Sequence, residues 1–88
     1  MEFRIKSIEP KNEYVVNKYY AAITGRECDV LHLMKGTGAT LLIDVPYDPG
    51  YPHRFYTTPV MDNRIGDDGT IVFETENSVY TLVKKVLV

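Results

Sequence analysis

Three residue types that could do covalent chemistry lie close together early in the chain. Cys28, Asp29 and His32 supply a thiol, a carboxylate and an imidazole, which are the parts of a nucleophilic triad. On an extended strand Cys28 and His32, four residues apart, share one face. The members of such triads normally converge from distant segments, however, and a lone cysteine in a small domain is far more often packed in the core. We therefore predict that the chain is not an enzyme.

Metal, phosphate and glycoside chemistry have weaker support still. A zinc site needs three or four converging ligands, and the two histidines and one cysteine lack any ligand spacing, so we expect no metal and no cofactor. The segment Gly36-Thr37-Gly38 is not followed by the Lys-Ser/Thr of a phosphate loop, and a hairpin turn is the better interpretation. Asp44 and Asp48 could act as a carboxylate pair only across a cleft, which a domain this small rarely forms.

The best candidate surface is the segment 47–58, which combines tyrosines, prolines, one arginine, one histidine and two threonines. Such a set can stack a base or ribose while the arginine binds a phosphate. It can equally form a hot spot for a protein, since Tyr and Arg dominate those. The structural alternative is a proline-stiffened loop whose tyrosines cover one end of the fold.

We predict a ligand-binding set that joins this segment to two residues of a later turn. Its members are Tyr51, His53, Arg54, Tyr56, Thr57, Thr58, Asn77 and Ser78. Asn77 and Ser78 are expected beside Thr57 and Thr58 if the last three strands form a meander.

Composition limits the classes of protein that the chain can represent. Its 88 residues indicate a single domain, 1–88, and 44% apolar with 25% charged residues is typical of a globular protein. A net charge of −2 supplies no basic face for duplex nucleic acid. One cysteine excludes an intrachain disulfide, and no apolar run approaches the roughly 18 residues of a membrane helix. We expect a cytoplasmic protein that contacts no membrane.

The first half of the chain alternates in a way that predicts strands with one helix. Residues 2–9 indicate a strand that Pro10 ends. Asn12 begins a predicted helix that continues to Ile23, and Gly25 sits where a C-terminal cap belongs. The β-branched and aromatic content also permits a strand at 12–24.

Short strands separated by turns are expected over the rest of the chain. Residues 29–34 and 39–45 indicate two strands around a turn at 35–38. A long strand is predicted at 53–65, where Pro59 marks an edge or a bulge because proline cannot donate to a ladder.

Two hairpins complete the expected pattern. Gly66–Gly69 predicts a turn before a strand at 70–75, and Glu76-Asn77 predicts a turn before a strand at 78–86, because Asn tolerates positive φ. The expected fold class is α+β, mainly β, with one short N-terminal helix and an antiparallel β-meander that forms a small, partly open barrel.

The C-terminal pattern resembles a known group of proteins. Thr57-Thr58-Pro59-Val60, the Gly66–Gly69 turn and the Thr75–Tyr80 hairpin are similar to a Thr-Thr-Pro-Val and Thr-x-Asn-Ser-x-Tyr pattern in short, poorly characterised phage and bacterial proteins. The resemblance covers residues 53–83, about a third of the chain. More faintly, the hairpin is similar to phage Thoeris anti-defence proteins, which sequester a cyclic nucleotide signal without cleaving it. The same motif can be read as structure alone, with Asn77 making the turn and Ser78 capping it.

This resemblance implies a small phage-type counter-defence or inhibitor protein. Its partner would be a nucleotide-like ligand, such as a cyclic nucleotide, or a host protein, bound without catalysis in the host cytoplasm. The alternative is a structural or accessory interaction domain, for example a virion or complex component. A core this small and a tyrosine content of seven residues also favour a homodimer, formed by pairing of an exposed strand edge.

Overall fold

Seven strands and one short helix account for most of the described chain. A computed structural model describes residues 1–13, 18–45, 48 and 50–85. The elements in chain order are β1 (Phe3–Pro10), α1 (Lys18–Ile23), β2 (Glu27–His32), β3 (Gly38–Ile43), β4 (His53–Pro59), β5 (Asp62–Ile65), β6 (Ile71–Glu74) and β7 (Ser78–Lys84).

The strands form one antiparallel sheet in the order β4-β3-β2-β1-β7-β6-β5. The prediction of a mainly β, antiparallel fold with little helix is therefore confirmed. The partly open barrel is wrong, because the sheet does not close: β4 and β5 are its two edges. The expected meander is interrupted between β4 and β5: the strands β2, β3 and β4 are consecutive neighbours in the sheet, and so are β5, β6 and β7.

The barrel fails where the chain leaves β4. We expected one strand over 53–65, but Val60 is buried and interrupts it. Val60 donates its N–H to the Thr37 carbonyl at 2.8 Å, and its own carbonyl accepts from Gly36 at 2.8 Å. The next residue, Met61, donates instead to the Glu74 carbonyl of β6 at 2.7 Å. These bonds end β4 at Pro59 and send β5 to the opposite edge of the sheet.

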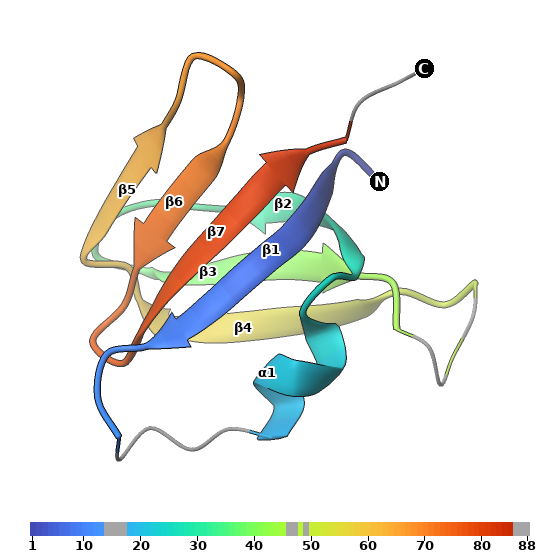
Figure 1. The fold of residues 1–88 in the computed structure, drawn as a ribbon, viewed down its shortest axis with the longest axis horizontal. Coiled ribbons are helices and arrows are strands. Elements are labelled where there is room, and N and C mark those ends of the chain that lie inside the picture. The colour runs from blue at the N-terminus through green and yellow to red at the C-terminus, as the bar shows by residue number, and fades with distance from the viewer. Residues whose placement is uncertain (14–17, 46–47, 49, 86–88) are drawn as a thin grey trace.

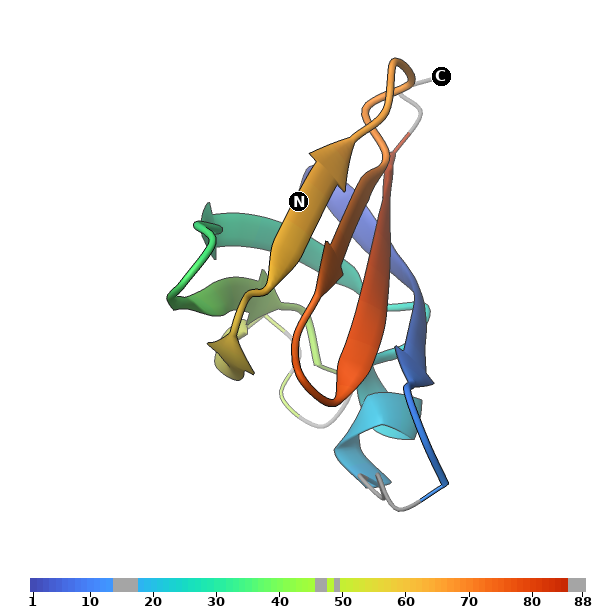
Figure 2. The same cartoon turned by 90° about the vertical axis from the view of Figure 1, so that its left-hand side faces the viewer.

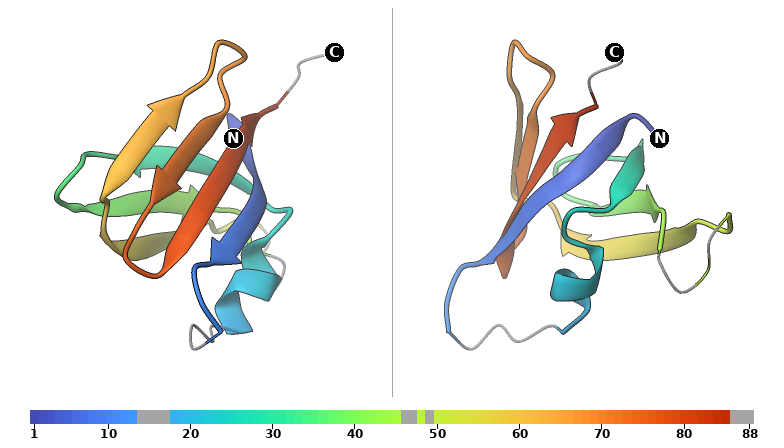
Figure 3. Two further views of the ribbon diagram at one scale, coloured as in Figure 1. Left: turned by 60° about the vertical axis from the view of Figure 1, so that its left-hand side comes forward. Right: turned by 45° about the vertical axis from the view of Figure 1, so that its right-hand side comes forward.

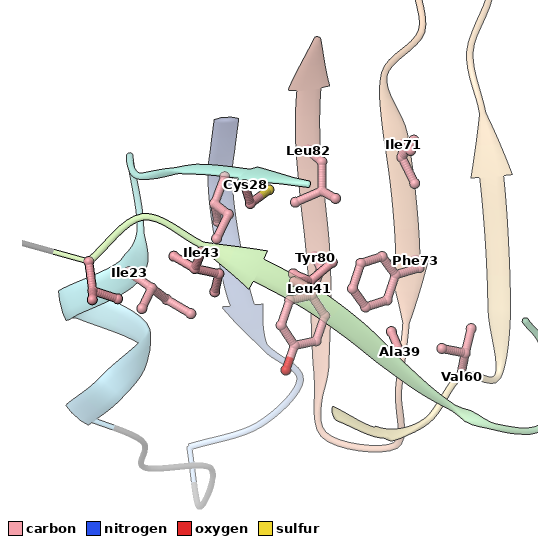
Figure 4. Packing of buried hydrophobic residues seen from close by; sticks show 12 residues of the cluster. Ile23, Cys28, Ala39, Leu41, Ile43, Val60, Ile71, Phe73, Tyr80 and Leu82 are labelled. Atoms are coloured by element: carbon pink, nitrogen blue, oxygen red, sulfur yellow. The ribbon is translucent and has the colours of Figure 1, made fainter. Parts of the chain in front are cut away.

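The sheet folds over on itself so that its two halves face each other. In Figure 1, β5, β6, β7 and β1 run side by side across β2, β3 and β4, and Figure 2 shows the two halves as separate layers. The buried apolar residues of both layers form one cluster, and Figure 4 shows β3 crossing β6 and β7 in projection where side chains of this cluster lie. That cluster is Ile5, Ile23, Cys28, Ala39, Leu41, Ile43, Val45, Val60, Ile71, Phe73, Tyr80 and Leu82.

The helix α1 lies at one end of the two layers (Figure 3). Its buried residue is Ile23, and Gly25 follows with φ of +87°, a value that glycine adopts without strain. Helix rather than strand is therefore confirmed at residues 18–23, and so is the glycine cap. Residues 14–17 of the expected helix lie outside the described part of the chain.

The β6–β7 hairpin forms where predicted, but its turn is stabilised by a different residue. Among the described residues, positive φ is confined to glycines, so Asn77 does not adopt it. Instead Thr75 pairs with Ser78 through a backbone bond of 3.0 Å, and the Thr75 hydroxyl accepts the backbone N–H of Asn77 and of Ser78 at 3.4 and 3.3 Å. A threonine side chain, nearly fully buried, stabilises the turn.

Candidate functional site

The edge strand β4 separates its side chains cleanly between the core and the outside. Phe55 faces inward, where its ring lies 5.6 Å from the ring of Tyr19 and 6.3 Å from that of Tyr80. Arg54 and Tyr56 flank it and are exposed. Strand geometry places these two side chains together on the outer face of the β2-β3-β4 half, since residues two apart share a face, whereas a register shift after Tyr56 interrupts the alternation before Thr58.

Sheet register extends this outer face across two further strands. Tyr56 is paired with Thr40 of β3, and Thr40 is paired with His32 of β2. A second row joins Arg54 to Leu42 of β3. Side chains of directly opposite residues on antiparallel strands lie about 4.5–5.5 Å apart at Cβ, so the rows form one continuous patch. We call His32, Thr40, Leu42, Arg54 and Tyr56 the outer patch.

Charges around the outer patch leave its arginine available. Asp44 is paired with Arg26 at 3.2 Å, and Asp29, the next residue in the row of Arg54, accepts the backbone N–H of Glu2 at 2.7 Å. No carboxylate of a described residue lies within salt-bridge distance of Arg54. The guanidinium therefore keeps its donors free for a partner.

Acidic groups at the margin of this face have basic side chains beside them. Lys85 forms an ion pair and a hydrogen bond with Glu27, which lower the pKa of that carboxyl. Asp48 bonds to His53 at 2.8 Å. These pairs show that Asp44 and Asp48, considered above as a carboxylate pair, each have a separate basic neighbour.

Of the eight predicted binding residues, the outer patch contains Arg54 and Tyr56, and Thr58 is exposed at the register shift that follows Tyr56. Tyr51 is exposed in the connection before β4, and His53 is turned towards Asp48. Thr57 faces inward, where its hydroxyl accepts the N–H of Ala39 at 2.9 Å. These three residues therefore do not share the outer face, because the alternation of the strand and the preceding loop direct them elsewhere.

Asn77 and Ser78 lie far from β4 in the sheet. The strands β3, β2 and β1 separate β4 from β7, so the expected neighbourhood with Thr57 and Thr58 does not form within the sheet. Ser78 is fully buried, and its hydroxyl donates to the hydroxyl of Tyr20 at 3.2 Å. Its surroundings are those of a core residue.

The hydroxyl of Tyr20 receives a second donor from the core. Tyr80 donates to it at 3.1 Å, and burial raises the pKa of Tyr80 well above its usual range. The ring of Tyr80 also stacks on Phe73, with centroids 4.6 Å apart and planes at 7°. This cluster attaches α1 to β7.

The triad considered for Cys28 does not assemble. Cys28 pairs with buried Ile43, whereas a register shift between Val30 and His32 sets His32 opposite Thr40, on the outer face. The shared face expected for Cys28 and His32 is therefore wrong, because the irregularity adds a residue to the alternation. Cys28 is fully buried, and burial, followed by the nearby charge of Asp29, raises the pKa of its thiol to about 12.

His32 has instead a local partner in the turn that follows its strand. Its Nε2 lies 2.7 Å from the Thr37 hydroxyl, which also donates to the Met34 carbonyl at 3.0 Å. Among the described residues, no group of three His, Cys, Asp or Glu side chains could hold a metal ion. Nor does any helix in the described part have the length and apolar character needed to cross a membrane.

Sequence reasoning missed Thr40 and Leu42 as members of the candidate site. The burial of β3 alternates strictly, with Ala39, Leu41 and Ile43 inside and the intervening residues partly exposed. A signal for this alternation exists in the sequence, since Thr40 is the polar residue of an otherwise apolar strand. The register that aligns it with Tyr56 is a property of the folded sheet.

Comparison with known proteins found no relative of this chain: no family model, no curated protein and no solved structure matches it.

Proposed function

We propose that this chain is a non-catalytic binding protein that recognises a protein partner through the outer patch. The observation that supports this function most directly is the register that sets Arg54 and Tyr56 of β4 beside Leu42 and Thr40 of β3. Tyrosine and arginine carry much of the binding energy in protein interfaces. Tyr56 is 66% exposed, which is a high fraction for a large ring on a regular strand.

The shape of the site favours a protein over a nucleotide-like ligand. Figures 1 and 2 show no described helix or strand over the outer side of β2, β3 and β4. A ligand on this sheet face would be covered from one side, whereas small-molecule sites usually bury about 70–90% of the ligand surface. A protein can supply the second wall itself. A cyclic nucleotide, the other partner expected from the sequence, would rely on Arg54 and the ring of Tyr56 alone for charge and stacking.

Binding alone, without a catalysed reaction, would account for the effect on the partner. The buried thiol of Cys28, with its raised pKa, is a poor nucleophile at neutral pH. The resemblance to phage and bacterial proteins suggests that the bound partner is sequestered or inhibited. A structural or accessory interaction domain would use the same surface, and the identity of the captured partner separates these two roles.

The test compares capture by the wild-type protein and three arginine or tyrosine variants. The proteins are immobilised and exposed to a lysate of the source organism and, for a phage protein, of its host. We expect Arg54→Ala and Tyr56→Ala to lose a partner that the wild type retains, with a melting temperature nearly unchanged because exposed side chains contribute little stability. Arg64→Ala is the matched control, since Arg64 is also exposed but lies on β5, at the opposite edge of the sheet.

A partner retained equally by wild type and Arg54→Ala would contradict the assignment of the outer patch. Calorimetric titration with a panel of cyclic nucleotides tests the partner class separately. Tight binding of one nucleotide that Arg54→Ala abolishes would replace the protein partner with a small anionic ligand.

A further inference from the structure

The open sheet leaves two strands without a neighbour on one side. They are β4 with seven residues and β5 with four. An unpaired strand edge presents backbone donors and acceptors that can pair with another chain, and short edge strands are one way in which proteins reduce that tendency. β5 is protected by its length in this way, whereas β4 is not.

The bonds of β3 determine which backbone groups of β4 remain free. Asp44, directly after β3, donates its N–H to the carbonyl of Glu27, the first residue of β2, at 3.0 Å. In an antiparallel sheet successive residues bond alternately to the two sides, so Leu41, three residues earlier, bonds towards β4. Its partner there is Phe55. The backbone N–H and C=O groups of the residues on either side of Phe55 therefore point to the free edge.

Those two residues are Arg54 and Tyr56, and the strand that carries them is held in place from within. The Phe55 ring is packed against Tyr19 and Tyr80, and the Thr57 hydroxyl accepts from β3 at 2.9 Å. An extended segment that is already fixed loses little conformational freedom when a second strand adds to it. The edge of β4 is thus a prepared surface for strand addition.

From this edge we infer that the protein forms a symmetric dimer in which β4 pairs antiparallel with β4 of a second copy. With the twofold axis at Phe55, Arg54 of each copy lies opposite Tyr56 of the other. A guanidinium beside a tyrosine ring is an attractive pair, and the register contains two of them. On the inner face the two Phe55 residues meet as a non-polar pair.

If the twofold axis passed through Arg54 instead of Phe55, the Arg54 residues of the two copies would lie directly opposite each other. Like charges in that position destabilise a pair of strands. The prolines at positions 52 and 59 lack an N–H and bracket the segment that can pair. Dimerisation would also join the two outer patches into one surface across six strands, with Arg54 and Tyr56 contributed alternately by the two copies. This inference is independent of the proposed function, because it concerns the backbone edge and not the partner.

The experiment measures mass and amide exchange on the full chain. Sedimentation equilibrium of the wild type should show the mass doubling as the concentration rises through the micromolar range. Tyr56→Pro removes the N–H that faces the free edge without removing a bond to β3, so it should stay monomeric at every concentration. Ile65→Pro is the matched control at the edge of β5, and it should dimerise like the wild type.

Residue-resolved amide exchange tests the same pairing without a substitution. The amides of Arg54 and Tyr56 should exchange more slowly as the dimer forms, while the amide of Ile65 does not change. A wild type that stays monomeric throughout would overturn the inference. So would a dimer in which the Arg54 and Tyr56 amides exchange as in the monomer, or one that Ile65→Pro abolishes and Tyr56→Pro retains.

Discussion

Removal of the Tyr20 hydroxyl should destabilise the protein more than removal of the hydroxyl of Tyr80 or Tyr51. This oxygen accepts hydrogen bonds from Ser78 at 3.2 Å and from Tyr80 at 3.1 Å. Ser78 is fully buried and Tyr80 is 2% exposed, so neither donor can turn to water. Tyr20→Phe therefore leaves two buried hydroxyl donors without an acceptor, while the ring and its packing remain.

The size of the effect follows from the cost of a stranded donor. A buried donor that loses its partner costs about 1–3 kcal/mol, whereas loss of both partners of one bond is close to neutral. Two stranded donors, each able to rotate towards a weaker acceptor, should lower the free energy of unfolding by about 2–4 kcal/mol. That is a large part of the roughly 5–15 kcal/mol typical of a small domain. Tyr80→Phe removes a single donor and leaves Tyr20 bonded to Ser78, so we expect a loss of about 1 kcal/mol.

Urea unfolding of the single and double variants measures these differences. The double variant Tyr20→Phe/Tyr80→Phe strands only the Ser78 donor and should cost about 2–3 kcal/mol less than the sum of the single variants, because loss of both partners of the Tyr20–Tyr80 bond is close to neutral. Tyr51→Phe is the control, since Tyr51 is 71% exposed, and it should change the free energy of unfolding by under about 0.5 kcal/mol. A Tyr20→Phe variant as stable as Tyr51→Phe, or strict additivity in the double variant, would refute the shared acceptor.

Three further predictions concern the turns and the core. Gly38→Ala should lower the free energy of unfolding by about 1–3 kcal/mol in urea titration, because the added Cβ would contact the backbone carbonyl of Thr57, which cannot move freely; an unchanged midpoint would contradict this close approach. Thr75→Val should lower the free energy of unfolding by about 1–2 kcal/mol, because the β6–β7 turn loses its side-chain acceptor. Asn77→Ala, at an exposed position without positive φ, should change it by under about 0.5 kcal/mol. A larger loss for Asn77→Ala than for Thr75→Val would indicate that the asparagine determines the conformation of the turn. Cys28 should react with a thiol reagent only upon unfolding, and rapid labelling of the native protein would show that the thiol is not packed as described. Because the thiol pKa is about 12 in the folded protein and about 8.5 in the unfolded chain, the contribution of the neutral thiol to stability is complete below the unfolded pKa and is lost as pH rises towards the folded pKa. Cys28→Ser should remove this loss of stability at alkaline pH.

The sequence by itself determined the local elements of the fold. Alternation of apolar and polar residues identified strands near 2–9, 29–34, 39–45, 70–75 and 78–86, because side chains on a strand point to opposite faces in turn. The glycine after α1 and the Gly66–Gly69 turn were also predictable locally, because glycine adopts positive φ without strain, as Gly25 and Gly69 do. The exposure of Arg54 and Tyr56 and the inward position of Phe55 also follow from alternation alone.

Other features depend on contacts between distant residues. The break at Val60 separates β4 from β5 because its backbone bonds to the β2–β3 turn, a partner that no local pattern near position 60 reveals. The register shift in β2 places His32 on the opposite face from Cys28. Ser78, predicted as a ligand donor, is a core residue whose hydroxyl bonds to Tyr20, 58 residues distant along the chain.

The outer patch shows the same division. Its side chains on β3 and β4 could be assigned to a face from their own strands, but the face of His32 could not, because of the register shift in β2. Which strands are neighbours, and in what register, depends on how the whole chain buries its apolar surface. Local periodicity repeats every two residues and is insensitive to the rest of the chain. The order β4-β3-β2-β1-β7-β6-β5 is set by backbone pairing and core packing across the entire molecule, and it is this order that brings Arg54 and Tyr56 beside Leu42 and Thr40 and leaves the edge of β4 open.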